Sequence, residues 1–565
     1  MCILEKLLNA KNEKLLYQFC FFFFVAVCGC LSIMTSFSPY NDDFCRYISN
    51  YQVGYNDNRH GSNLLEIPLF FSLLYSYDTV PFFTIISCAI LACIAIICKK
   101  ILDIIHKCEY ASNKYIFACL IPIVVNPYLV EVLIFRFDNL FITIALLCSI
   151  GAAYFSVAKK YHNSGSEKSE VKYVADMSIA KWIFIQVWLL LFSLLIYQAA
   201  FSAYIVVFTY VLLVNFSKNK QLSQIISEMR HWTYSILFSI GSYIPFAIAT
   251  NVEKMELQSA FNREMPGSIH DMINNILENI CNYFKGLYND WSVNTIGVIF
   301  FALSICFTLT FLVDTWKNIK NRHIAIARIT VICICVFAFF LSPLGVSIPL
   351  ELSSHKIYEI MNPRIVYSII ILMAFILYKN YFFLMQVATE NIHAKKYTLY
   401  RRMYEGFLFF FGLWSIYYMN CFGNIMYIQQ QLQHNVFYDL ANDLHDIRQE
   451  YQNFSRLYIH GNVCTPVMRN FYSIYPINKR ILPEPWHMAI YSFFDYYCYK
   501  KNNKPSTLAT LPRNNRLKEN MTLLKSKPWY SIYSVDCNEL YVKLNGIDIC
   551  GSTCNSIMVF KFDKY

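Results

Sequence analysis

Two adjacent carboxylates, Asp42 and Asp43, directly follow an apolar stretch at residues 17–38, and Arg46 comes shortly after them. A carboxylate held beside a substrate can act as a general base that takes the proton from an attacking hydroxyl group. The competing interpretation is a solvated helix end, because Pro and Asn-Asp are common stop signals. The loop that follows, residues 39–79, is far longer than a simple connection, which favours a functional role.

Other polar residues lie where further apolar stretches end. Glu131, Arg136 and Asp138 fall within eight residues. An arginine here could bind a phosphate group, or Arg136 and Asp138 could form only a local ion pair. The remaining candidates for substrate binding are Arg59 and His60 in the loop 39–79, Tyr197, Gln198, and Arg364, with Asp290 as a weaker candidate. Tyr and Gln also join helices within membranes, and an arginine at a membrane edge also pairs with lipid headgroups.

The spacing of the Cys and His residues predicts no metal site. Many of the 21 cysteines stand inside apolar runs, where Cys acts as a small hydrophobic residue. No paired CxxC motifs and no zinc-type Cys/His spacing occur in the sequence. A phosphate-binding glycine loop for a soluble nucleotide is also missing. We therefore expect no metal and no other cofactor.

The composition excludes most soluble classes of protein. Of 565 residues, 56% are hydrophobic and only 15% are charged. These values exclude a disordered chain, a fibrous repeat and a nucleic-acid-binding module. So much apolar surface requires a lipid environment. We predict an all-α polytopic membrane protein with eleven spans, at residues 17–38, 80–98, 115–133, 139–158, 181–199, 200–216, 232–250, 294–313, 328–346, 364–380 and 405–424.

The basic residues predict the orientation of these spans. With the N-terminus in the cytoplasm, the predicted inside segments contain 24 Lys and Arg residues and the outside loops contain 8. Basic residues concentrate on the cytoplasmic side of membrane proteins. An odd number of spans then places the residues after about 425 outside. The first span lacks a small-residue cleavage site, so we expect it to remain as an anchor.

Residues 426–565 have the pattern of a small α+β domain outside the membrane, separate from the transmembrane domain of residues 1–425. A polar, helix-like stretch at 427–455 precedes two strand-like segments, 455–463 and 530–545. This tail contains Cys464, Cys498, Cys537, Cys550 and Cys554. Disulfides are plausible if the compartment is oxidising, but sequence alone does not give their pairing.

The ordered set of these motifs resembles the GT-C membrane glycosyltransferases. Within that class the chain is most similar to the bacterial serotype-converting O-antigen glucosyltransferases of the Gtr type. The similarity is carried by Asn41-Asp42-Asp43 with Arg46, by the run from Asn126 to Asp138, by Tyr197-Gln198 and by Pro363-Arg364. It covers residues 38–364, whereas the tail matches only in its general kind.

The resemblance implies an inverting glucosyltransferase in the bacterial inner membrane, with its C-terminal domain in the periplasm. The implied donor is undecaprenyl phosphate glucose, and the acceptor is a hydroxyl group of lipid-linked O-antigen. Asp42 or Asp43 would act as the base, while Arg136, Arg364 or Arg59 would stabilise the phosphate leaving group. The resemblance further implies dependence on a donor synthase and a donor flippase, with no nucleic-acid partner.

Two other functions fit part of the pattern. A transporter or flippase of lipid-linked glycan would also have many spans, but it more often places ionisable residues near the membrane midplane. An O-antigen polymerase would be expected to place its long, Arg-bearing external loops centrally rather than after the first span. The charges gathered at one face therefore favour the glycosyltransferase.

The predicted topology can be tested with reporter fusions. A reporter at Lys99 should report the cytoplasm and a reporter at Asn442 the opposite side, because an odd number of spans separates the N-terminus from the tail. Alkaline phosphatase and fluorescent-protein fusions at both positions measure this. If both positions report the same side, the eleven-span model fails.

Overall fold

The computed structural model describes most residues in 10–35, 81–106, 115–134, 138–162, 178–258, 269–292, 295–318, 322–345, 366–390 and 394–450, together with five strand segments between 454 and 562. The chain divides into two compact units. The first contains residues 1–35 and 52–423, and the second contains residues 36–51 and 424–565. The predicted loop 39–79 and its amphipathic segment lie outside the described residues.

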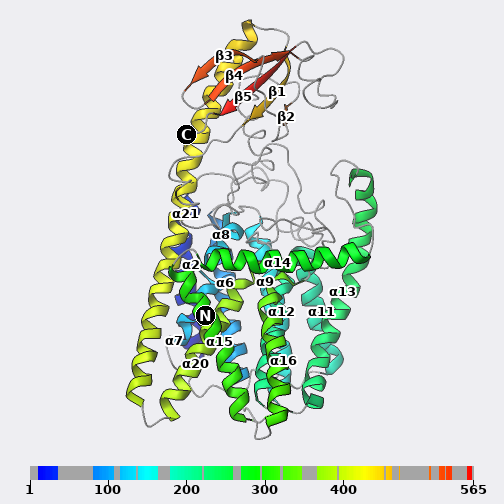
Figure 1. The fold of residues 1–565 in the computed structure, drawn as a ribbon, viewed down its shortest axis with the longest axis vertical. Helices are drawn as coiled ribbons and strands as arrows, with labels where there is room; N and C mark the ends of the chain where they lie inside the picture. Colours follow the sequence, from blue (N-terminus) through cyan, green and yellow to red (C-terminus); the bar gives the residue numbers. More distant parts are fainter. Residues whose placement is uncertain are drawn as a thin grey trace, which may run out of the picture. The chain divides into compact units, whose positions relative to one another are not determined.

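The first unit is a bundle of apolar helices (Figure 1). Among the described residues, eight segments are long and apolar enough to cross a membrane: Leu15–Thr35, Phe82–His106, Asn139–Ala158, Ile179–Ile196, Gln198–Ser217, Ile296–Lys317, Ile326–Leu344 and Ile369–Val387. They correspond to helices α2, α6, α9, α11, α12, α15, α16 and α20. Each coincides with one of the predicted spans, so this chain is an all-α polytopic membrane protein in its first unit.

The predicted span 115–133 is a broken helix. Helix α7 (Tyr115–Ala118) leads through the 3-10 turn η2 (Ile121–Ile123) into α8 (Pro127–Ile134), and the two parts meet at a bend of 49°. The pair forms either one bent span or a re-entrant segment.

The two remaining predicted spans lie inside longer helices of lower hydropathy. Residues 232–250 belong to α13 (Leu222–Gln258), and residues 405–424 belong to α21 (Ala394–Glu450). Ser, Tyr, Trp and Gly interrupt the apolar residues in both segments, which lowers their hydropathy. The total of eleven spans therefore stays a prediction.

Helix α14 (Ile269–Ser292) runs across one end of the bundle instead of along it (Figure 1). One face is buried and includes Asn279, Tyr283, Leu287 and Asp290. A second face exposes the apolar side chains of Ile273, Leu277 and Tyr288, and a third exposes polar ones that include Glu278 and Lys285. Three such faces suit a helix lying along a membrane surface.

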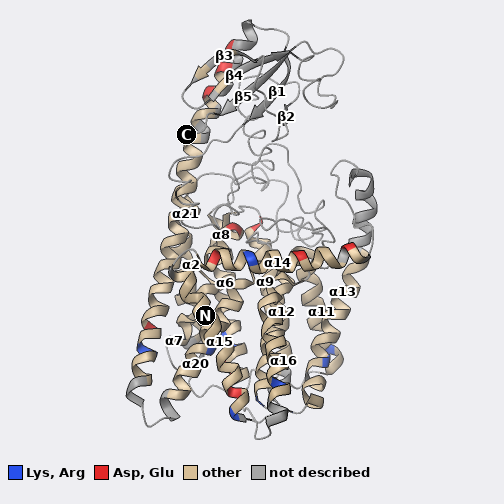
Figure 2. Cartoon of the chain, in the orientation of Figure 1, with Lys and Arg blue, Asp and Glu red and all other residues tan. Residues whose placement is uncertain are grey.

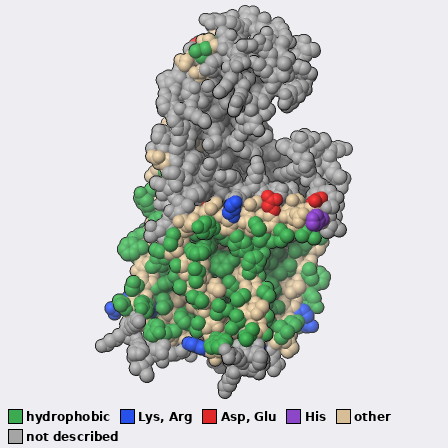
Figure 3. All heavy atoms as spheres, viewed as in Figure 1, with side chains coloured by type: hydrophobic (Ala, Val, Ile, Leu, Met, Phe, Trp, Pro, Cys, Tyr) green, Lys and Arg blue, Asp and Glu red, His purple; other side chains and the backbone are tan. Residues whose placement is uncertain are grey.

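The surface below α14 is mostly apolar in the view of Figure 3. Charged side chains gather toward the two ends of the bundle, with few between them (Figure 2). This distribution is the one expected when the middle of the bundle faces hydrocarbon.

Small residues allow two helix pairs in the bundle to approach closely. A side chain at Gly423 of α21 would collide with the backbone of Ser32 in α2, and one at Gly29 would collide with Val125. Beside this contact, Asn420 accepts a hydrogen bond from the backbone N–H of Ser32 at 3.1 Å and donates one to the carbonyl of Cys28 at 2.8 Å. Helix α21 is thereby fixed against α2, which directly precedes the predicted catalytic loop.

The second unit contains a five-stranded mixed sheet with the order β2-β1-β5-β4-β3. Strands β1 (Phe454–His460), β2 (Leu508–Thr510) and β5 (Ser556–Phe562) are parallel neighbours, and β3 (Met521–Lys527) and β4 (Tyr530–Asp536) add antiparallel pairs. Strands β1 and β4 overlap the two strand-like segments seen in the sequence. The five tail cysteines lie outside the described residues, and the domain boundary at 425 stays a prediction.

Candidate functional site

The turn before α8 is built by the local sequence Asn126-Pro127. The side-chain oxygen of Asn126 accepts a hydrogen bond from the backbone N–H of Tyr128 at 3.0 Å, so Asn126 caps the new helix. Pro127 occupies the first helical position, where its missing N–H costs nothing. The amide nitrogen of Asn126 lies 3.3 Å from the sulfur of Met373 in α20. The cap and Pro127 together begin α8 as a new helix after η2, at the 49° bend described above.

Helix α8 carries Glu131, a predicted substrate-binding residue. Glu131 is buried, with an exposed fraction of 2%, and Asp138, which directly precedes α9, is buried as well. The next residue, Asn139, ties α8, α6 and α9 together. Its amide donates to the hydroxyl of Thr84 at 3.1 Å and to the carbonyl of Leu133 at 3.4 Å. The structure thus buries both predicted carboxylates, one in α8 and one directly before α9.

A third carboxylate reaches this region from α14. The hydroxyl of Tyr128 in α8 donates to a carboxylate oxygen of Asp290 at 2.7 Å, and both residues are buried. Hydrogen bonds to an ionised acceptor are stronger than neutral ones. The bond therefore holds the C-terminal part of α14 on α8. Asp290, the weaker candidate from the sequence, lies near the end of α14, and α15 begins only at Thr295.

A second link holds α14 on the bundle. The hydroxyl of Tyr283 donates to the carbonyl oxygen of Phe340 in α16 at 2.9 Å. Burial raises the pKa of the Tyr283 hydroxyl well above its usual range, so the group remains a proton donor. We call the end of the bundle that carries α8, α14 and the starts of α9 and α12 the α14 end.

The predicted residues Tyr197 and Gln198 also lie at a helix junction, between α11 and the turn η3 (Gln198–Ala200) that opens α12. The amide of Gln198 donates to the hydroxyl of Tyr243 in α13 at 2.9 Å. The ring of Tyr197 packs against that of Tyr367, with centroids 6.0 Å apart. Beside them, the hydroxyl oxygens of Ser202 and Ser368 are 2.7 Å apart, which joins α12 to the turn before α20.

The other predicted site residues lie outside the described part of the chain. They are Asp42, Asp43, Arg46, Arg59, His60, Arg136 and Arg364. The structure therefore positions the helix ends beside which these residues occur in the sequence, and the roles of these residues stay predictions. Among the described residues, no group of three or more His, Cys, Asp and Glu side chains could hold a metal ion.

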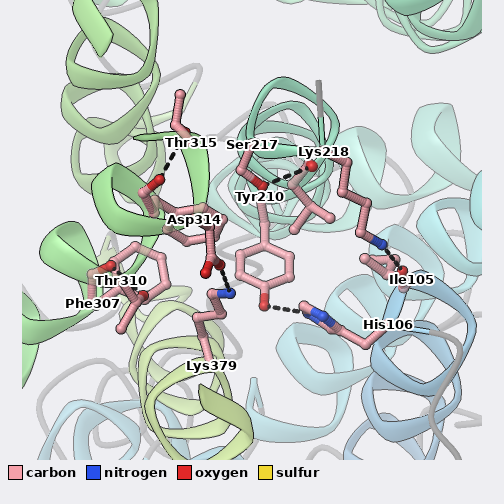
Figure 4. A network of polar contacts seen from close by, with 12 residues as sticks. Ile105, His106, Tyr210, Ser217, Lys218, Phe307, Thr310, Asp314, Thr315 and Lys379 are labelled. Atoms are coloured by element: carbon pink, nitrogen blue, oxygen red, sulfur yellow. Dashed lines mark hydrogen bonds and ion pairs between the residues drawn. The ribbon is translucent and has the colours of Figure 1, made fainter. Parts of the chain in front are cut away.

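The opposite end of the bundle holds a different polar network (Figure 4). Lys379 forms an ion pair with Asp314 at 2.7 Å, and His106 lies 2.8 Å from the hydroxyl of Tyr210. Lys218 donates to the carbonyl of Ile105 at 2.8 Å, which neutralises part of the charge at the C-terminal end of α6. These groups are bonded to one another, as expected for contacts that hold helix ends together.

Sequence reasoning missed two pairings between residues far apart in the chain, Tyr128 with Asp290 and Asp314 with Lys379. Tyr128 and Asp290 are 162 positions apart, and Asp314 and Lys379 are 65 apart. No local spacing indicates contacts over such separations. The sequence offered one signal for a partner of Asp290. The segment around it has strongly amphipathic spacing, and Asp290 falls on the mostly apolar face. A carboxylate on that face requires a partner.

The α14 end thus combines buried carboxylates with neutral hydrogen-bond donors. Carboxylates can accept protons from hydroxyl groups or bind sugar hydroxyls, while Tyr, Asn, Gln and Ser can donate to phosphate or sugar oxygens. A family model described as Glucosyl transferase GtrII matches residues 31–413, which is more than half of the chain. The chain belongs to the GtrII glucosyl transferase family.

The family match covers every predicted site residue and all the described helices that build the α14 end. It confirms the glycosyltransferase interpretation over the transporter and the polymerase. Neither a curated protein nor a solved structure matches the chain significantly.

The Tyr128–Asp290 bond provides a test of how the α14 end is held together. Tyr128→Phe should lower the free energy of unfolding by about 1–3 kcal/mol, because it leaves a buried carboxylate oxygen without this donor. It should also reduce glucosyl transfer. Asp290→Asn keeps an acceptor at the same position and should cost less stability. Thermal unfolding in detergent and a transfer assay measure the two effects.

Tyr288→Phe is the matched control, because Tyr288 lies on α14, the helix of Asp290, with 62% of its surface exposed. This variant should behave like the wild type. If Tyr128→Phe also retains wild-type stability and transfer, the contact between α8 and α14 does not organise the site.

Proposed function

We propose that this GtrII family member transfers glucose, with inversion, from undecaprenyl phosphate glucose to a hydroxyl group of lipid-linked O-antigen. The reaction would take place at the α14 end, which the distribution of basic residues assigns to the periplasmic face of the bacterial inner membrane. The observation that carries the proposal is the family match over residues 31–413. The polar helix ends gathered at the α14 end support it.

A donor that is anchored in the membrane fits the architecture. A polyprenyl chain can remain in hydrocarbon beside an apolar bundle while its phosphate lies at the membrane edge. The candidate carboxylates and arginines occur in the sequence at predicted outer helix ends, which is the depth of such a phosphate. A soluble sugar nucleotide would instead need a site for its nucleotide, and the sequence has no glycine-rich phosphate loop.

The chemistry requires a base and an anion-stabilising group. The base removes the proton of the acceptor hydroxyl, whose oxygen attacks C1 of glucose on the face opposite the phosphate. The bond between C1 and the phosphate oxygen then breaks, and polyprenyl phosphate leaves with an additional negative charge. We assign the base to Asp42 or Asp43, and favour Asp42 because it is nearer the membrane edge. Arg136 and Arg364 would stabilise the leaving phosphate.

The remaining predicted residues would bind the substrates. Arg46, Arg59 and His60 belong to the same loop as the proposed base. Glu131, Asp138, Tyr197 and Gln198 lie at the α14 end, where carboxylates and amides can bind sugar hydroxyls. The proposal needs no metal ion, because arginine can neutralise the phosphate charge.

Single Asn substitutions at Asp42 and Asp43 test the assignment of the base. Each keeps the side-chain shape and removes the charge. At the base position, the turnover of glucosyl transfer should fall at least about 10²-fold. The other position should show a smaller loss, mainly in apparent affinity for the acceptor. The measurement is transfer from purified undecaprenyl phosphate glucose to a lipid-linked acceptor, with chelator present.

Glu278→Gln is the control, since it neutralises a solvent-exposed carboxylate of α14 that has no role in the proposed chemistry. Its turnover should equal that of the wild type. Near-normal turnover in both Asn variants would show that the first loop does not supply the base. Failure of the wild type to transfer glucose from this donor would overturn the choice of donor.

A further inference from the structure

Tyr367 stands out among the buried tyrosines of the bundle. It lies in the turn before α20, at the α14 end, and none of its surface is exposed. Within the part of the chain that the structure describes, its hydroxyl has no hydrogen-bond partner. Its ring packs on that of Tyr197, a predicted substrate-binding residue.

Other buried tyrosines in this bundle have partners. Tyr283 donates to the carbonyl of Phe340 at 2.9 Å, and Tyr404 donates to the carbonyl of Leu377 at 3.0 Å. The hydroxyl of Tyr204 lies 3.2 Å from that of Ser156. An unsatisfied buried hydroxyl costs free energy, and such groups are rare in native structures. Among the described tyrosines, Tyr367 is thus the one whose buried hydroxyl is left to donate to a ligand.

The surroundings of Tyr367 favour an anionic ligand. The hydroxyl is neutral and can donate one hydrogen bond. Tyr367 lies in the turn before α20 (Ile369–Glu390), where its own carbonyl already accepts the backbone N–H of Ile370 and its hydroxyl is left to donate. In sequence it follows the predicted phosphate ligand Arg364 by three residues. A phosphate oxygen is an acceptor that matches this donor.

We propose that the Tyr367 hydroxyl donates a hydrogen bond to the phosphate of the bound polyprenyl lipid. This inference rests on the proposed function, because it assigns a further residue to the donor site. The hydroxyl is covered in the ligand-free protein, so the phosphate displaces covering groups when it binds. Tyr367 is thus a donor-binding residue that motif reasoning did not identify.

The variant Tyr367→Phe tests this directly, because it removes only the hydroxyl oxygen. Loss of a hydrogen bond to a charged group should raise the KM for undecaprenyl phosphate glucose about tenfold to a hundredfold. The unfolding temperature without ligand should stay the same or rise, because the variant removes an unsatisfied polar group. Undecaprenyl phosphate, which lacks the sugar, should raise the unfolding temperature of the wild type more than that of the variant.

Tyr404→Phe is the matched control, because it removes a buried hydroxyl that has a protein partner, the carbonyl of Leu377, away from the α14 end. It should lower the unfolding temperature while the KM for the donor stays at the wild-type value. This pattern is the reverse of that expected for Tyr367→Phe. The pair of variants therefore separates a structural hydroxyl from a ligand-binding one.

Three results would overturn the inference. A wild-type KM and a wild-type response to undecaprenyl phosphate in Tyr367→Phe would show that the hydroxyl does not contact the lipid phosphate. Weakened binding of the glucose-bearing lipid alone would place the contact on the sugar. A lower unfolding temperature without any change in KM would make the hydroxyl structural.

The same measurements distinguish this inference from the proposed function. If the wild type transfers glucose and Tyr367→Phe behaves like it, only the inference fails. If the wild type does not transfer glucose, yet undecaprenyl phosphate stabilises it through Tyr367, the proposed function fails and the phosphate contact stands.

Discussion

Polar groups buried in an apolar helical bundle must be paired, and this requirement determines where the chain can hold chemistry. Burial without a partner costs several kcal/mol for a neutral group in hydrocarbon and more for a charge. The bundle meets the requirement within its helices, where Ser156 and Ser235 both donate to Gln186, and also at the helix ends of the α14 end. There Asn126 caps α8, Asn139 joins α6 to α9, and Tyr128 binds Asp290. At the α14 end, the same polar side chains thus fix the helix ends and satisfy one another's hydrogen bonds.

The two ends of the bundle meet this requirement in different ways. Opposite the α14 end, Lys379 is bonded to Asp314, and Lys218 is bonded to a helix-terminal carbonyl. These contacts pair each charge with a partner inside the protein. At the α14 end, carboxylates and neutral donors from α8, α14 and the helix junctions gather beside helix ends that continue into the predicted catalytic loops. The proposed reaction at the α14 end, with a lipid-linked donor, is consistent with this difference between the two ends.

Much of the fold could be predicted because apolar segments of about 20 residues are read directly from composition. Eight predicted spans are confirmed, including the division near Gln198, where α11 ends at Ile196 and α12 begins at Phe201. The bend at Asn126-Pro127 follows from local capping chemistry. Helix α14 was missed because its apolar residues recur on one face and do not form a continuous run, so the segment resembled a polar loop.

The site was predictable only in part. Glu131, Asp138, Tyr197 and Gln198 could be proposed from the sequence because polar residues at the ends of apolar runs are conspicuous, and their roles stay predictions. Tyr128 and Tyr367 were not, because a tyrosine in an apolar run looks like ordinary core. Their chemistry depends on partners or ligands that only the tertiary structure brings near. Sequence spacing carries no signal for contacts such as that between Tyr128 and Asp290.

The central claim is that the α14 end binds the phosphate of a polyprenyl-linked glucose donor. Photocrosslinking tests it most directly, with a donor analogue that carries a photoreactive group next to the phosphate and with mass spectrometry to map the modified peptides. The account predicts labelling of peptides from α8, from the junction of α11 and α12, and from the start of α20, with protection by unlabelled undecaprenyl phosphate glucose. Protectable labelling concentrated around His106 and Lys379 would contradict it.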